Sequence, residues 1–122
     1  MNIYLGIEDE QRQLLLKLIL DHLADVKVWA YGSRVEGTAR PSSDLDLVVF
    51  SRPDQESMVN SLREALEESN LTFRVDLMVW DELPVAFQRR IKAHYLPLLE
   101  YWVLPNKGTK RDIGFEILQD YQ

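Results

Sequence analysis

Two short apolar runs that each carry one aspartate constrain the fold of this chain more than any other feature. They span residues 45–49 and 75–79, are made of valine, leucine and methionine, and have Asp46 and Asp76 at their second positions. Side chains alternate across a β-strand, so the aliphatic residues at odd positions of the first run share one face and Asp46 lies on the other. Each run therefore predicts a strand with one face packed against helices and a carboxylate on the other.

Helices that can cover such strands are also visible. Residues 8–24 carry aliphatic side chains at helical spacing: Leu15, Leu16, Ile19, Leu20 and Leu23, with Leu14 and Leu18 widening the face. A second helix is expected after Arg52-Pro53-Asp54, with a buried stripe of Met58, Leu62, Ala65 and Leu66. A third is expected after an N-cap at Asp81, with Pro84 in its first turn and Phe87, Ile91 and Tyr95 facing the core.

A further strand is expected at residues 26–31, while residues 100–104 suit either a short edge strand or a longer helix. The order helix, strand, turn, strand, helix, strand, helix predicts an α/β fold, a small mixed β-sheet with helices packed on one face.

The length of 122 residues allows one modest core. We expect one domain over residues 1–105, and residues 106–122 are open to two interpretations, a partner-docking tail or an added segment. The chain has no cysteine, no visible secretory signal and no apolar run of about 18 residues, so we expect a cytoplasmic protein without a membrane span.

The net charge is −6, from 20 acidic and 14 basic residues, which argues against direct, non-specific binding to DNA or RNA. Basic residues do gather in two places, Arg89-Arg90-Lys92 and Lys107-Lys110-Arg111. Either group suits an acidic partner or a nucleotide phosphate, and a solvated helix face and tail are the simpler interpretation.

Asp44 and Asp46 are two residues apart, so both are predicted to project from one face of a strand. Neighbouring ionised carboxylates repel each other and burial adds to the cost, so the pair is stable at neutral pH mainly when a cation bridges it. Mg²⁺ is the expected ion, because it prefers oxygen ligands from carboxylates, water and phosphates. With no cysteine, and with His22 and His94 far away in sequence, a soft-metal site is not expected.

Gly32 and Ser33 are separated from Asp44 by ten residues and follow the expected strand at 26–31. A glycine lets the backbone approach a ligand closely, N–H groups at a helix start can donate to an anion, and the serine hydroxyl adds one hydrogen bond. We therefore expect the phosphates of a nucleoside triphosphate here. Arg34 and Arg40 flank the turn. Two interpretations stay open for each of them, contact with the triphosphate and simple solvation.

Asp76 interrupts an otherwise core-like strand. A buried carboxylate without a partner is costly, so a metal ion or a cationic neighbour such as Arg74 is expected beside it, and we favour the metal. With Mg²⁺ on the aspartates and phosphates on the glycine-serine turn, the arrangement suits in-line attack at phosphorus by a bound hydroxyl.

This spacing of Gly-Ser, Asp-x-Asp and a third strand aspartate resembles the nucleotidyltransferase superfamily that includes DNA polymerase β and kanamycin nucleotidyltransferase. Two segments are most similar to minimal nucleotidyltransferases, small prokaryotic domains encoded beside a HEPN-domain partner. The segments are VWAYGSRVEGTARPSSDLDLVVF and FRVDLMVWDELPVAFQRRI. The resemblance covers roughly residues 10–100 and implies a nucleotidyltransferase core. It further implies that Gly32 and Ser33 hold the triphosphate, that Asp44 and Asp46 bind two Mg²⁺ ions, and that Asp76 completes the metal site and helps to deprotonate the acceptor.

The activity that the resemblance implies is Mg²⁺-dependent transfer of AMP from ATP to a hydroxyl, a tyrosine of a HEPN ribonuclease toxin, with this chain as the antitoxin. Two alternatives stay open: an antitoxin that neutralises its partner by contact alone, and a transferase acting on a small molecule such as an aminoglycoside. The second needs an enclosing domain or a dimer. A homodimer or a hetero-oligomer with the partner is expected.

Several other residues have simpler interpretations. Trp29, Trp80, Trp102, Tyr31 and Tyr101 are expected to pack in the core or at its rim, although an aromatic side chain near the glycine-serine turn would also suit an adenine ring. His94 is expected at the surface without a catalytic task, and Glu36 is expected to face solvent.

Overall fold

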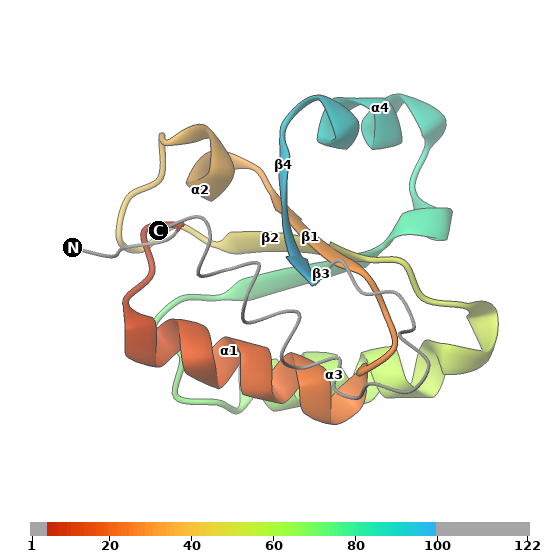
Figure 1. Ribbon diagram of the computed structural model, residues 1–122, viewed down its shortest axis with the longest axis horizontal. Helices are drawn as coiled ribbons and strands as arrows, with labels where there is room; N and C mark the ends of the chain where they lie inside the picture. Colours follow the sequence, from red (N-terminus) through yellow and green to blue (C-terminus); the bar gives the residue numbers. More distant parts are fainter. Residues whose placement is uncertain (1–4, 100–122) are drawn as a thin grey trace, which may run out of the picture.

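The computed structural model describes residues 5–99, which form a four-stranded mixed sheet packed against helices (Figure 1). In chain order the elements are α1 (Asp9–His22), β1 (Val28–Tyr31), α2 (Ser33–Glu36), β2 (Leu45–Val49), α3 (Glu56–Glu67), β3 (Val75–Val79), α4 (Val85–Ala93) and β4 (Tyr95–Leu99). Single 3-10 turns at Pro53–Gln55 and Trp80–Glu82 precede α3 and α4. The expected α/β class with a small mixed sheet is confirmed.

The strand order is β3-β2-β1-β4. β1 runs antiparallel to both β2 and β4, whereas β3 runs parallel to β2. Parallel neighbours need a crossover connection, and α3 supplies it between β2 and β3. Both expected strands with a single aspartate are therefore adjacent in the sheet.

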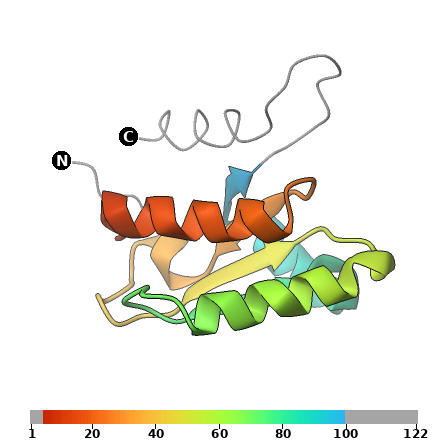
Figure 2. The ribbon, with the colours of Figure 1, turned by 90° about the horizontal axis from the view of Figure 1, so that it is seen from below.

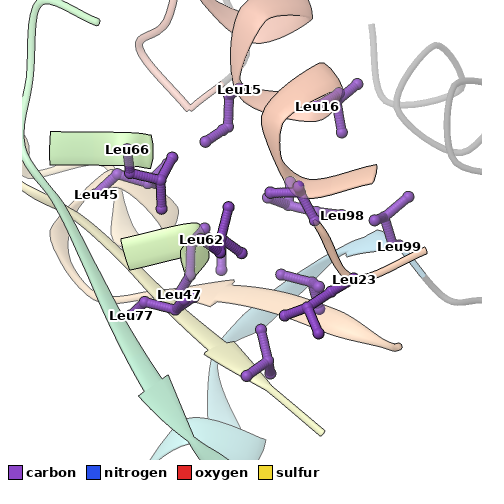
Figure 3. Packing of buried hydrophobic residues seen from close by; sticks show 14 of the residues in the cluster. Leu15, Leu16, Leu23, Leu45, Leu47, Leu62, Leu66, Leu77, Leu98 and Leu99 are labelled. Atoms are coloured by element: carbon purple, nitrogen blue, oxygen red, sulfur yellow. The ribbon is translucent and has the colours of Figure 1, made fainter. Parts of the chain in front are cut away.

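The main core lies between the sheet and the two long helices. Helices α1 and α3 lie side by side on one face of the sheet, as Figure 2 shows from below. The aliphatic side chains of β2 at positions 45, 47 and 49 point into this core, as expected from strand alternation. Figure 3 shows how leucines from the helices meet those from the strands: Leu15, Leu16, Leu23, Leu45, Leu47, Leu62, Leu66, Leu77, Leu98 and Leu99.

A smaller cluster covers part of the opposite face. Trp29 of β1 and Val48 of β2 are buried there against Leu83 and Ile91, the latter from α4. Aromatic rings extend the cluster, and Tyr95 stacks on Trp29 with a ring separation of 3.7 Å. The expected packing role of Trp29, Trp80 and Tyr31 is thus confirmed. Because α4 covers only part of this face, the ends of β1 and β2 beside it stay accessible.

The first helix has the expected position, and its leucine and isoleucine stripe is buried. The stripe expected on α3 is confirmed at Leu62 and Leu66, which are buried, and Ala65 is partly buried. It was wrong at Met58, which is 46% exposed, and Val59 is buried instead. The 3-10 turn before α3 sets where the helix begins and therefore which side chains face the sheet.

The expectations for the third helix were partly wrong. Pro84 is the N-cap of α4, and Asp81 lies in the preceding 3-10 turn instead of capping the helix. Ile91 is buried and Phe87 partly buried, but Tyr95 begins β4 and is 38% exposed. The sequence pattern did not predict β4, which adds a strand before the segment 100–104 that had been considered for that role.

Several expectations lie outside the described residues. They concern the domain boundary at 105, the tail 106–122, the segment 100–104, the side chains Tyr101 and Trp102, and the basic residues Lys107, Lys110 and Arg111. Among the described helices, none has the length and apolar character needed to span a bilayer.

Candidate active site

Strand register brings two of the predicted aspartates together. Asp46 of β2 is paired with Asp76 of β3, and on its other side with Tyr31 of β1. Residues directly opposite each other on neighbouring strands share a face, so the three side chains form a row across the sheet. The row lies on the face that α4 partly covers, away from the leucine core. Asp44 is exposed and lies just before the first residue of β2.

The glycine-serine turn lies directly against this row. Gly32 has a φ of +85°, and a Cβ atom at this position would collide with Oδ2 of Asp46. Only glycine meets both requirements, a left-handed backbone and contact distance to a carboxylate. Ser33 follows as the first residue of α2, where the first N–H groups of a helix have no acceptor within the helix. The two halves of the predicted phosphate and metal site are therefore adjacent.

The electrostatics of the row favour a cation. Burial raises the pKa of Asp46, and the negative charges of Asp76 and Asp44 raise it further. Burial and the charges of Asp46 and Asp76 likewise raise the pKa of Tyr31 to about 12. The folded chain thus holds several oxygen groups in mutual repulsion, and a proton or a metal ion relieves it.

The donor set fits Mg²⁺ better than a metal enclosed by protein ligands. Among residues 5–99, no three acidic or histidine side chains are gathered closely enough to surround an ion by themselves. Mg²⁺ usually takes one or two carboxylates from the protein and the remaining oxygens from water and substrate phosphates. Asp46 with Asp44 or Asp76 can supply that share, beside a turn suited to phosphates.

A cleft of about 270 Å³ opens beside the row. Residues of and directly after α4 line one part of it: Phe87, Arg90, Ile91 and His94. The other lining residues are Tyr31, Gly32, Glu36 and Asp46. Ser33, Asp44 and Asp76 do not line this cleft. Asp76 instead borders a separate cleft of about 390 Å³ between β3 and α3.

The sequence only partly predicts the contribution of α4 to this cleft. For Arg89-Arg90-Lys92 it leaves open a solvated helix face or contact with an acidic partner or a nucleotide phosphate, and for His94 it predicts a surface position. His94 is exposed, and both Arg90 and His94 line the cleft together with Asp46. The spacing carries this signal, since Arg90 and Ile91 lie three and four residues after Phe87, and residues at such spacings share one side of a helix. Tyr31, expected mainly as a packing residue, is the aromatic side chain directly before the glycine-serine turn and also lines the cleft.

Arg34 does not offer its charge to a phosphate. The side chain is buried, with 6% of its surface exposed, and each nitrogen of its guanidinium donates to backbone carbonyl oxygens. Five such bonds use the whole donor capacity of an arginine. The expected contact with the triphosphate is therefore not available in this arrangement, whereas Arg40 is exposed and its role stays a prediction.

Comparison with known proteins decides the family. A family model described as a nucleotidyltransferase domain matches residues 12–99. The chain belongs to the nucleotidyltransferase domain family. The probable protein adenylyltransferase MntA of Haemophilus influenzae is 35% identical to this nucleotidyltransferase domain over 97 residues, which are 79% of the chain and 85% of that relative. The resemblance inferred from the glycine-serine and aspartate pattern is confirmed.

Two solved structures resemble the nucleotidyltransferase domain in fold. One is described as a toxin-antitoxin with AMP-PNP and has a TM-score of 0.51 at 18% identity, covering 93% of this chain and 87% of the other. The second, a mutant of the toxin-antitoxin MntA-HpeT, has a TM-score of 0.50 at 18% identity, with coverages of 90% and 86%. They confirm the nucleotidyltransferase fold expected from the sequence.

Proposed function

We propose that this nucleotidyltransferase domain transfers AMP from ATP to a hydroxyl of a protein partner, and that the partner is a HEPN-domain toxin. On this proposal the chain is the antitoxin of the pair and works in the cytoplasm. The observation that carries the proposal is the row of Asp46 and Asp76 beside the Gly32 turn. The relative named as a probable protein adenylyltransferase, matched over 85% of its length, supports a protein as the acceptor.

The residues have distinct proposed roles. Asp44 and Asp46 hold Mg²⁺, Asp76 completes the metal site, and Gly32 and Ser33 contact the triphosphate through their backbone and the serine hydroxyl. Bound Mg²⁺ would neutralise phosphate charge and lower the pKa of an attacking hydroxyl. Arg90, on the wall of the cleft, is suited to a triphosphate oxygen in place of Arg34.

The proposed reaction is a single in-line displacement. The acceptor oxygen, from a tyrosine of the partner, forms a bond to the α-phosphorus of ATP while the bond from that phosphorus to the β-phosphate bridging oxygen breaks. Pyrophosphate leaves, and the proton of the acceptor hydroxyl passes to the carboxylate of Asp76. The chain mainly positions and neutralises charged groups in this reaction.

A separate acceptor protein is consistent with the shape of the site. The cleft of about 270 Å³ is slightly smaller than the pockets that usually enclose a ligand, roughly 300–1,000 Å³. Asp44 is exposed to solvent. Such an open site is suited to an acceptor that arrives on the surface of another protein, and less to a small sugar antibiotic that the site would have to enclose alone.

The decisive experiment is the intact mass of the HEPN partner after co-expression with the chain. We expect a gain of one or more AMP units with the native chain and no gain with the double variant Asp44→Ala, Asp46→Ala. A matched control replaces Asp21 and Asp54, two exposed aspartates in ion pairs on α1 and before α3, and should leave the gain intact. An unchanged mass in a stable native complex would overturn the transferase and favour an antitoxin that acts by contact alone.

A further inference from the structure

Arg34 lies at the centre of a hydrogen-bond network that the proposed reaction does not use directly. Its Nη1 donates to the carbonyl oxygens of Leu5 and Gly6 at 3.0 and 3.1 Å, and its Nη2 donates to those of Pro41 and Ser43 at 3.0 and 2.7 Å. Its Nε donates to the same Ser43 oxygen at 3.2 Å. A buried guanidinium thus joins two segments that are far apart in sequence, the turn before α1 and the loop before β2.

The contact with Ser43 bears directly on the site. The oxygen that receives two of these bonds belongs to the peptide group that links Ser43 to Asp44, so the two bonds fix the plane from which Asp44 projects. Arg34 itself follows Ser33 in the first turn of α2. One side chain therefore connects the phosphate turn to the first aspartate of the metal pair.

The turn before α1 is built to meet the same side chain. Leu5 and Gly6 have φ values of +61° and +69°, and Leu5 is the only non-glycine residue with positive φ among residues 5–99. This backbone is costly for leucine and needs support from its surroundings. The two carbonyl bonds to Arg34 supply support, and a Cβ on Gly6 would lie 3.1 Å from Nη1 of Arg34.

We propose that Arg34 is a positioning residue that sets Asp44 relative to the Gly32 turn, and that the Leu5–Gly6 turn is the anchor against which it does so. The effect of Arg34 on catalysis rests on the proposed function. The structural link between the Leu5–Gly6 turn, Arg34 and Asp44 does not depend on it. Loss of the network should loosen the loop before β2 and weaken metal binding, while the sheet stays folded.

The test compares Arg34→Gln and Arg34→Lys with a matched control, Arg63→Gln. Arg63 also donates through Nε and Nη2 to one backbone oxygen, that of Leu77, and so joins α3 to β3 without contacting the loop before β2. The first readout is hydrogen exchange at the amides of Ser43 and Leu45, which donate to the carbonyl oxygens of Arg40 and Arg74. We expect exchange about tenfold faster in Arg34→Gln, with partial recovery in Arg34→Lys and no change in Arg63→Gln.

The second readout is the affinity for Mn²⁺ as a probe of the metal pair, measured without ATP or a partner. We expect Arg34→Gln to weaken it about tenfold, as loss of a supporting contact commonly does in metal sites. Unchanged exchange and unchanged Mn²⁺ affinity in a folded Arg34→Gln chain would overturn the proposal. If the proposed function were wrong, the partner would stay unmodified with the native chain. The expected changes in hydrogen exchange and in Mn²⁺ affinity would still be seen in Arg34→Gln.

A second pair of variants keeps the proposal testable if Arg34→Gln does not fold. Gly6→Ala pushes a methyl group toward Nη1 of Arg34, whereas Gly37→Ala, at a φ of +83°, meets no atom within 4 Å. Both carry the same kind of backbone strain, so only the contact with Arg34 differs. We expect faster exchange at Ser43 and Leu45 in Gly6→Ala alone, and equal exchange in the two variants would refute the coupling.

Discussion

Replacing Gly32 with alanine tests how closely the phosphate turn must approach the acidic row. The residue has φ and ψ values of +85° and −157°, a backbone region that is essentially confined to glycine and costs other residues on the order of 1–3 kcal/mol. The new Cβ would also overlap Oδ2 of Asp46 and lie 3.2 Å from its Cγ. The carboxylate must move to make room, and a displacement of about 1 Å in such a group costs on the order of 100-fold in rate.

Gly37→Ala separates strain from collision. Gly37 has a φ of +83°, but a Cβ there would meet no atom within 4 Å. Gly37→Ala should therefore lose about 1–2 kcal/mol of stability, seen as a melting temperature lower by roughly 4–8 °C, and Gly32→Ala should lose more because the collision adds to the strain. In AMP transfer from ATP to the partner, only Gly32→Ala should lose about 100-fold in initial rate. Equal rates for the two variants would refute the argument that Gly32 is needed for its contact with Asp46.

Three further predictions concern single side chains of the site. Asp46→Asn should stabilise the metal-free chain at neutral pH. The pKa of Asp46 is raised from 3.8 in the folded chain, so the native fold holds this proton more tightly than the unfolded chain does. The native chain therefore loses stability as the pH rises through the raised pKa, and the variant does not. With a chelator present, the variant should have a higher melting temperature than the native chain at neutral pH, and this difference should vanish in acid. Equal melting temperatures at neutral pH would contradict the prediction. The pKa of Tyr31 is raised to about 12, so the fold should lose stability as the pH rises from 10.0 to about 12. An alkaline absorbance titration should show one tyrosine that ionises near pH 12, and this step should be absent in Tyr31→Phe. Identical titrations of the two chains would exclude the raised pKa of Tyr31. Arg90→Ala should raise the KM for ATP about tenfold with a smaller change in kcat, since it removes one charged contact. Arg89→Ala, beside it but outside the cleft, is the control, and equal KM values in the two variants would count against a role for Arg90.

The sequence was most informative where periodicity and chemistry pointed the same way. The aspartate at the second position of each apolar run predicted strands with one packed and one acidic face, and both lie in the sheet as expected. The spacing of Gly32 and Asp46 predicted that the turn and the acidic strand meet, and a glycine with positive φ against a carboxylate is what the fold contains. Such patterns depend only on residues that are near one another in the sequence, so they can be recognised before the three-dimensional structure is known.

What the sequence did not reveal depends on contacts between distant segments. The pairing of Asp46 with Asp76 follows from the parallel register of β2 and β3, which no local pattern encodes. For Arg34 the sequence leaves contact with the triphosphate and solvation open and does not predict its burial, because the carbonyl oxygens from positions 5 and 6 reach it only after folding. β4 was missed because Tyr95 also continues the spacing of the preceding helix and because Pro97 weakens a strand pattern, although proline is tolerated on an edge strand.

The register of the acidic row limits how related chains can differ in length. Side chains on a strand alternate with a period of two, so one inserted or deleted residue within β2 or β3 would turn the aspartate of that strand into the leucine core. Helix α3 is restricted in a similar way, because Val59, Leu62 and Leu66 must keep facing the sheet. The turns on either side of α3 have no such restriction, because loops at the surface can gain or lose residues. We therefore expect relatives to vary in length in these turns, while substitutions alone distinguish them within the two strands.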